Sequence, residues 1–160
     1  MNVVMPLVFR SAELSEHRTI ESMVIESFEP ITWFKKLDGR IGPLNGQDWR
    51  ARWQTRMRDV FETQIVLVGE TGGEIAAMSS GTLDAASALA YIDLLAVDPR
   101  FQGQGYGREM LRGMMRHMKT LGAQYVYLDC LTSNDKGNAL YLAEGFEEVV
   151  RQVRWFRKLS

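Results

Sequence analysis

The sequence predicts a mixed α/β (α+β) domain with a central twisted sheet flanked by helices. Short apolar runs typical of strands alternate along the chain with longer segments whose apolar residues recur at helical spacing. The most apolar run, residues 88–97, stops at Asp98-Pro99 and is followed at once by a glycine-rich turn and a helical pattern. Because 160 residues fit one compact core, we expect a single domain over residues 1–160.

Charge and composition exclude several classes of protein. Nineteen basic and twenty acidic residues leave a net charge of −1, so the basic footprint of a nucleic-acid-binding protein is missing. No segment approaches the ~20 apolar residues of a membrane span, and the first residues lack the pattern of a signal peptide. We therefore expect a cytoplasmic protein with no nucleic-acid or membrane partner. Cys130 is the lone cysteine, so no intrachain disulfide is expected.

The first half of the chain is predicted to hold one strand, two helices and a long connection. The strand covers residues 3–10, and Ser15 is expected to cap a helix that contains Ile20, Met23, Val24 and Phe28. Residues 29–47 carry Pro and Gly without a sustained period, which predicts a long loop without secondary structure. Asp48 is expected to cap the next helix.

The second half is predicted to supply the rest of the sheet. Residues 64–69 and 74–80 form a hairpin, and the buried strand 88–97 follows. A helix over residues 106–121 ends at Gly122, and a strand over 125–131 leads to a helix capped by Asn134 that ends at Gly145. Residues 146–150 and 153–159 are expected to close the sheet as a final pair of strands.

The glycine-rich turn, residues 100–108, has the composition of an anion site. The first N–H groups of a helix lack internal partners and carry about half a positive charge from the helix dipole. Glycine at three alternate positions lets the backbone approach a phosphate closely. A P-loop is excluded because the sequence lacks its lysine motif, and the Rossmann spacing fails because Arg108 stands where its third glycine is required.

Two motifs together resemble the GNAT acetyltransferase superfamily. Its cofactor loop, [Gln/Arg]-x-x-Gly-x-[Gly/Ala], is met by Arg100, Gly103 and Gly105. About thirty residues later Asn134 is followed by Tyr141 and then by Gly145-Phe146, as in the family's later segment. The resemblance is specific from residue 88 to residue 146. Gly137 departs from it, because relatives usually carry alanine at that place.

The resemblance implies a GNAT-type acyl-CoA N-acyltransferase fold that uses acetyl-CoA as cosubstrate and no metal. In the family, the strand before the loop pairs through its main chain with the pantetheine arm, and the loop presents amides to the pyrophosphate. The cofactor-binding residues implied in this way are Leu95, Ala96, Val97, Arg100, Gly103, Gln104, Gly105, Tyr106, Gly107, Arg108, Asn134 and Tyr141.

Three residues are candidates for catalysis. By resemblance, Tyr141 protonates the departing CoA thiolate; the alternative is a tyrosine that only packs, with its hydroxyl at the surface. An alkylamine is mostly protonated at neutral pH, so a base or an ammonium-binding carboxylate is also expected. Asp129, which we expect to be desolvated among apolar neighbours, and Asp93, which we place on one face with Tyr91 and Leu95, are rivals for that role. Either aspartate could instead be a hydrogen-bonded strand residue without a catalytic role.

The sequence thus predicts an enzyme that transfers the acetyl group of acetyl-CoA to a primary amine of a small molecule or a protein. The alternatives are a non-catalytic acyl-CoA sensor on the same fold and an interaction domain without a ligand. The family also makes a homodimer a candidate assembly. Aromatic residues in and beside the long connection are candidates for the acceptor site: Trp33, Phe34, Trp49 and Trp53.

Overall fold

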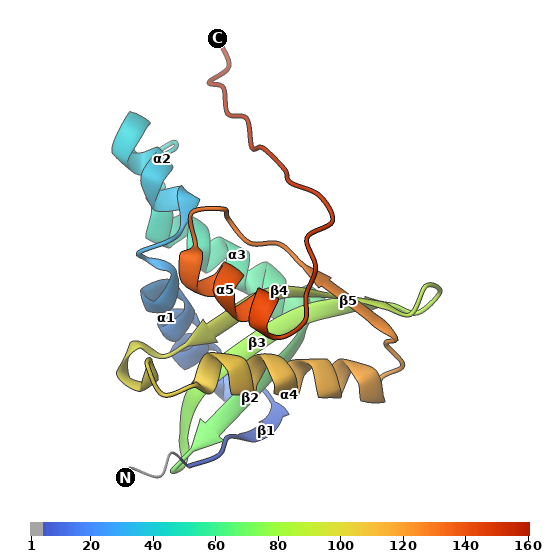
Figure 1. Cartoon of the computed structure of the whole chain (residues 1–160). Coiled ribbons are helices and arrows are strands. Elements are labelled where there is room, and N and C mark those ends of the chain that lie inside the picture. Colours follow the sequence, from blue (N-terminus) through green and yellow to red (C-terminus); the bar gives the residue numbers. More distant parts are fainter. Residues whose placement is uncertain (1–4) are drawn as a thin grey trace. The chain divides into compact units, whose positions relative to one another are not determined.

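The computed structural model describes residues 5–160, and it divides into a first compact unit that ends at Asp129 and a second from Cys130 to Ser160. The first unit holds a five-stranded sheet in the order β1-β2-β3-β4-β5 (Figure 1). Its strands are β1 (Val8–Ser11), β2 (Ile65–Thr71), β3 (Glu74–Asp84), β4 (Leu89–Val97) and β5 (Tyr125–Leu128). The first four are antiparallel and β5 is parallel to β4, which is the mixed sheet that the sequence predicts.

Helices cover both faces of this sheet (Figure 1). α1 (His17–Phe28) and α3 (Trp49–Thr63) pack on one face, where Val68 of β2 joins their buried core. α4 (Tyr106–Thr120) packs on the other face. Gly69 follows Val68 in β2 and so faces the opposite side of the sheet, where a Cβ on Gly69 would lie 3.1 Å from Met110 Sδ. The apolar face of α4 is buried through Met110, Leu111, Met114 and Met118. Among residues 5–160, no helix has both the length and the apolar character needed to cross a bilayer.

The beginning of the chain differs from the predicted boundaries. β1 starts at Val8, and residues 3 and 4 of the predicted strand lie outside the described part of the chain. Ser15 does not cap α1: it lies inside a 3₁₀ turn, η1 (Leu14–Glu16), where Glu16 Oε1 accepts the Glu13 N–H at 2.9 Å. The N-cap of α1 is Glu16, and no side chain there accepts from the first N–H groups of the helix.

The predicted loop over residues 29–47 is wrong, because it contains the helix α2 (Trp33–Ile41). Thr32 caps this helix by accepting the Phe34 N–H, and the same Oγ1 accepts the indole N–H of Trp53 at 2.9 Å. Asp38 accepts the N–H of Trp49, the first residue of α3, at 2.6 Å. These bonds join α2 to α3. They are tertiary contacts, and the spacing of apolar residues in the sequence does not predict them.

Most of the later elements lie where the sequence predicts them. Asp48 caps α3 through the Ala51 N–H at 2.8 Å, and the β2–β3 hairpin turns at two glycines with positive φ, Gly72 and Gly73. α4 ends before Gly122, which also has positive φ. β5 is shorter than predicted and stops at Leu128.

The second unit contains one helix, α5 (Asp135–Ala143). As predicted, Asn134 caps it by accepting the Gly137 N–H at 3.1 Å, and Gly145 follows its end with positive φ. The two strands predicted over residues 146–150 and 153–159 are absent, since no strand is assigned anywhere in residues 146–160. Apolar side chains there are exposed, Trp155 by 91% and Val149 by 93%. Apolar β-branched composition favours a strand only where a neighbouring strand supplies hydrogen bonds.

The pairing of β3 with β4 contains a bulge. Ser80 pairs with Leu94 and Gly81 with Ile92, so Asp93 is an extra residue in β4 with no residue opposite it. The two backbones approach closely here: a Cβ on Gly81 would lie 2.1 Å from the Tyr91 carbonyl oxygen. Only glycine fits this position without displacing a strand.

We expect Gly81→Ala to destabilise the fold by about 3 kcal/mol, because backbone atoms must move to admit the methyl group. Gly39→Ala in α2 is the matched control, since a Cβ there would meet no atom within 4 Å and alanine is the better helix former. Urea denaturation followed by circular dichroism measures both. Equal stability of the two variants would contradict the close approach at Gly81.

Candidate functional site

The bulge decides which way the side chains of β4 point. Leu95 pairs with Ser79 and Ile92 with Gly81, and Ser79 and Gly81 lie two residues apart on one face of β3. A Cβ on Gly81 would lie 3.1 Å from Met118 of α4, so Ile92 and Leu95 both face α4. Our expectation that Asp93 shares a face with Leu95 is therefore wrong: the extra residue turns the Asp93 side chain towards α3 instead.

Asp93 is held by Arg56 of α3 and by Gln64, the C-cap of that helix. Its Oδ1 accepts from Arg56 Nη2 at 2.5 Å, and its Oδ2 accepts from Gln64 Nε2 at 2.8 Å. The carboxylate side chain is 9% exposed, and the Arg56 guanidinium also lies over the Trp53 ring. Both carboxylate oxygens of Asp93 are thus engaged, one in an ion pair with Arg56 and one in a hydrogen bond from Gln64.

Asp129 lies in a more open position. The last pair between β4 and β5 is Ile92 with Leu128, so Asp93 and Asp129 are the first residues beyond the paired segment on their two strands. Asp129 is exposed, contrary to the desolvation that we expected. Its Oδ2 accepts the hydroxyl of Tyr91 at 3.1 Å, and the Tyr91 ring stacks on that of Tyr127 with centroids 4.8 Å apart.

Tyr91 thus stands between the two carboxylates. Burial raises the pKa of its phenol well above the usual value, and the charges of Asp93 and Asp129 raise that pKa further. The phenol stays protonated and donates its hydrogen bond to Asp129. Together these residues form a polar cluster on the α3 side of the sheet: Arg56, Gln64, Tyr91, Asp93, Tyr127 and Asp129. The sequence gives no sign of Arg56 and Gln64 as site residues, because a helical pattern does not mark the residue that pairs with a strand.

Beyond this cluster, β4 has a free edge within the first unit. β4 continues to Val97, whereas β5 ends at Leu128, opposite Ile92. The Asp98 N–H donates to Ala76 O at 2.8 Å, so in the alternating antiparallel ladder the main-chain groups of Ala96 and Leu94 also point towards β3. Those of Leu95 and Val97 point the other way, to the free edge. Of the three strand residues implied by resemblance, the geometry thus leaves Leu95 and Val97 able to pair with a ligand, while the main chain of Ala96 faces β3.

A turn with an exposed backbone follows this edge. η2 (Pro99–Phe101) leads to Gly103 and Gly105, which have φ of +79° and +84°, and Gly105 is the N-cap of α4. Gln102 fixes the turn to the strand, because its Nε2 donates to Val97 O at 3.1 Å. Gly107 lies in the first turn of α4, where the N–H groups have no partner inside the helix. The turn therefore has positive-φ glycines directly before the start of a helix, the backbone that anion binding requires.

The side chains of the turn differ in their roles. Arg100 is 63% exposed and pairs with Asp98 and Glu74, which raises the pKa of its guanidinium. Tyr106 is buried, and its hydroxyl donates to Met5 O at 2.8 Å, so only its main chain faces the turn. Gln104 and Arg108 are exposed.

The second unit carries Asn134 and Tyr141. Asn134 caps α5, and a Cβ on Gly137 would lie 2.6 Å from Asn134 Nδ2, so this glycine gives the amide its room. Burial, with a smaller contribution from Cys130, raises the pKa of Tyr141 to about 12. The Tyr141 ring packs edge-on against Phe146 with centroids 5.8 Å apart. Burial also raises the pKa of the Cys130 thiol, which keeps it protonated at neutral pH.

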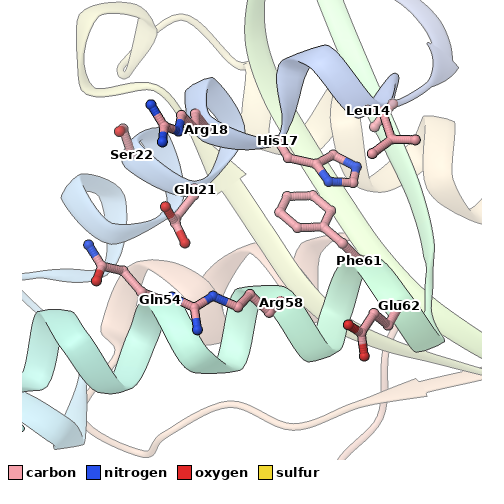
Figure 2. A pocket seen from close by; sticks show the side chains of 10 residues that line it. Leu14, His17, Arg18, Glu21, Ser22, Gln54, Arg58, Phe61 and Glu62 are labelled. Carbon is pink, nitrogen blue, oxygen red and sulfur yellow. The ribbon is translucent and has the colours of Figure 1, made fainter.

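A separate groove of about 970 Å³ lies between α1 and α3 and contains none of these residues. His17 stacks on Phe61 with centroids 3.7 Å apart, and charged side chains such as Arg18, Glu21 and Arg58 surround them (Figure 2). Within residues 5–160, no group of three or more His, Cys, Asp or Glu side chains is arranged to hold a metal ion.

Comparison with known proteins agrees with this geometry. Residues 37–146 match the model of the acetyltransferase (GNAT) family. The chain is 36% identical over 66 residues to the N-alpha-acetyltransferase RimI of Mycobacterium tuberculosis. This alignment covers 41% of this chain and 40% of that protein. It is 32% identical over 100 residues to the glucosamine 6-phosphate N-acetyltransferase of Arabidopsis thaliana, covering 58% of this chain and 66% of that protein.

The fold is shared with a solved structure, the ribosomal-protein-S18-alanine N-acetyltransferase from Escherichia coli. The TM-score is 0.67 at 20% identity, over 90% of this chain and 79% of that one. This likeness confirms the predicted fold. The aligned segment spans less than half the length of the mycobacterial relative.

The raised pKa of Tyr141 has a consequence for stability at alkaline pH. A phenol whose pKa is about 12 in the folded protein, against ~10 when unfolded, adds no pH dependence at neutral pH and costs stability as pH rises from ~10 to ~12. We expect Tyr141→Phe to flatten this alkaline loss, measured by urea unfolding at several pH values. Tyr125→Phe, at an exposed strand residue, is the control. An identical alkaline profile in wild type and Tyr141→Phe would contradict the burial of Tyr141.

Proposed function

Since the chain belongs to the acetyltransferase (GNAT) family, we propose that it transfers the acetyl group of acetyl-CoA to a primary amine. The observation that carries this proposal is the free edge of β4 followed directly by the glycine turn and the start of α4. The edge offers the main chain of Leu95 and the N–H of Val97 to an amide-containing arm, and the turn offers the first N–H groups of α4, which lack partners inside the helix, to phosphate. Pantetheine linked to a pyrophosphate has these two features in the same order.

The residues of the turn then share one task. Gly103 and Gly105 let the backbone approach the pyrophosphate, and the N–H groups of Tyr106, Gly107 and Arg108 begin the helix that faces it. The further contacts proposed for the cofactor come from the side chains of Arg100, Gln104, Arg108 and Asn134. No metal takes part in this proposal.

The acetyl group of a cofactor lying along this edge would reach the polar cluster at the bulge, where the acceptor amine must also arrive. We assign Asp129 as the carboxylate that receives the acceptor's ammonium group and takes its proton, directly or through water. Tyr91 and Tyr127 supply aromatic faces beside it, and cations are attracted to such faces. Asp93, held by Arg56 and Gln64, positions the bulge and adds negative charge near the amine.

The reaction itself breaks one bond and forms another. The neutral amine attacks the thioester carbonyl carbon, the C–N bond forms, and the C–S bond breaks to release CoA thiolate. Tyr141 is the proposed acid: with a pKa of about 12 it remains protonated at neutral pH. Tyr141 donates its phenolic proton to the departing sulfur, which leaves as the thiol. The proton that the nitrogen loses as the amide forms returns to the Tyr141 oxygen, directly or through water.

The acceptor is a primary amine of a small molecule or of a protein N-terminus. The names of the relatives include both kinds, an N-alpha-acetyltransferase and an acetyltransferase of glucosamine 6-phosphate. Asp129 and the two tyrosine rings recognise the ammonium group that both kinds share. The homodimer implied by the family resemblance and the cytoplasmic location expected from the sequence are also part of this proposal.

The experiment that tests this function is release of free thiol from acetyl-CoA in the presence of an amine panel of peptide N-termini, amino sugars, aminoglycosides and polyamines. We expect turnover with at least one amine, and we expect Tyr141→Phe to lower kcat at least 10-fold while its Kd for CoA stays within twofold. Binding of CoA without thiol release from any amine would favour a sensor. A protein that acetyl-CoA does not stabilise against heat would be neither.

The proton-accepting role belongs to Asp129 in this proposal, and Asp129→Asn separates it from Asp93. We expect Asp129→Asn to lower kcat/KM for the amine about 100-fold and to leave CoA affinity unchanged. Arg58→Ala in the α1–α3 groove is the matched control and should keep full activity. If Asp129→Asn keeps wild-type kinetics, Asp129 is a structural partner of Tyr91 alone.

A further inference from the structure

Two adjacent serines of β3 lie beneath the bulge, and both are completely buried. The hydroxyl of Ser79 donates to the carbonyl oxygen of Leu94 at 2.7 Å. The hydroxyl of Ser80 has no hydrogen-bond partner among residues 5–160. A buried hydroxyl contributes to stability only when it is paired, so the two serines have different physical roles in the same strand.

The bond from Ser79 fixes a peptide group rather than a side chain. Leu94 directly follows the extra residue Asp93, at the point where the regular ladder between β3 and β4 is interrupted. By holding the Leu94 carbonyl towards β3, the Ser79 hydroxyl sets the plane of the peptide that joins Leu94 to Leu95. In a trans peptide the N–H points opposite to the C=O. The Leu95 N–H is therefore held outward, on the free edge of β4.

This N–H is the first main-chain donor beyond the last β4–β5 pair, Ile92 with Leu128, that points to that edge. It lies on the strand beside Asp93 and Asp129, where the proposed acetyl transfer takes place. When the amine attacks, negative charge develops on the thioester oxygen. A donor already fixed in direction stabilises that charge without reorganising during the reaction.

We propose that Ser79 is a positioning residue for acetyl transfer: its hydroxyl fixes the Leu94–Leu95 peptide so that the Leu95 N–H donates to the thioester oxygen of acetyl-CoA. The inference rests on the proposed function, because it requires acetyl-CoA along β4. Ser79 itself touches neither the cofactor nor the amine. It acts from the opposite side of the strand, through the peptide that it holds.

The test is the infrared carbonyl band of acetyl-CoA labelled with ¹³C at the acetyl carbonyl and bound to the full chain without an amine. A hydrogen bond to the carbonyl oxygen lowers this frequency. In the wild type we expect the carbonyl frequency of bound acetyl-CoA to lie below that of acetyl-CoA without this hydrogen bond. In Ser79→Ala we expect the frequency to rise by at least half of that difference, and in Ser80→Ala we expect the wild-type frequency. Affinity for CoA, which has no acetyl carbonyl, should stay within twofold in both variants.

Kinetics with the panel amine that supports turnover give a second readout. We expect Ser79→Ala to lower kcat about 10-fold, less than the loss of a whole oxyanion donor, at an unchanged KM for acetyl-CoA. Ser79→Thr, which keeps the hydroxyl, should restore the lowered band, and Ser79→Cys serves if Ser79→Ala does not fold. Ser80→Ala should keep wild-type kcat with equal or higher thermal stability.

The outcomes separate this inference from the proposed function. If the wild type binds acetyl-CoA with a lowered band and Ser79→Ala keeps both that band and kcat, the positioning role is overturned and the transferase proposal stands. The same holds if Ser79→Ala and Ser80→Ala lose activity equally, since that would show a general effect of altered packing. If the wild type does not bind acetyl-CoA, both proposals fail together.

Discussion

The extra residue in β4 is the constraint on which the candidate site depends. Without it, strict alternation would place Ile92 and Leu94 on the same face of the sheet. With it, Ile92 faces α4, and Leu94 joins the buried core formed with α1 and α3. One inserted position thus lets a single strand bury residues on both faces and still present Asp93 to α3. A bulge also increases local twist, and the pairing with β5 stops at the residue before Asp93.

The bulge is supported from both sides. On one side Gly81 admits the close approach of the β4 backbone, and Ser79 bonds the Leu94 carbonyl. On the other, Arg56 and Gln64 satisfy the carboxylate of the extra residue, whose burial without partners would be costly. α3 is in turn fixed at its beginning by Asp38 of α2, which also pairs with Arg52. The position of one carboxylate in the sheet therefore depends on contacts with α3, and through α3 on α2, both of which are far from it in the sequence.

The two aspartates show how environment separates residues of equal chemistry. Asp93 has both oxygens occupied and is nearly buried, so it contributes fixed charge and geometry. Asp129 is exposed and accepts one hydroxyl, so it keeps the capacity to accept from an ammonium group. Tyr91 links the two, since its phenol donates to one carboxylate, while burial and then the charges of both carboxylates raise the phenol's pKa and keep it protonated.

The sequence by itself determined the features that depend on local chemistry. These are the hairpin at Gly72-Gly73, the caps at Asp48 and Asn134, and the glycine turn before α4. Each depends only on residues that are close together in the sequence. The family, too, followed from local motifs, because a cofactor loop is a short backbone device. Only the tertiary structure decided that residues 33–41 form a helix, that residues 146–160 lack strands, and that Asp93 pairs with Arg56 while Asp129 stays open. The physical reason is that each of these outcomes depends on partners distant in the sequence. The helix shares Thr32 with α3, and a strand over residues 146–160 would need a neighbouring strand. The side on which Asp93 lies depends on one unpaired residue, which reverses the alternation that sequence periodicity assumes.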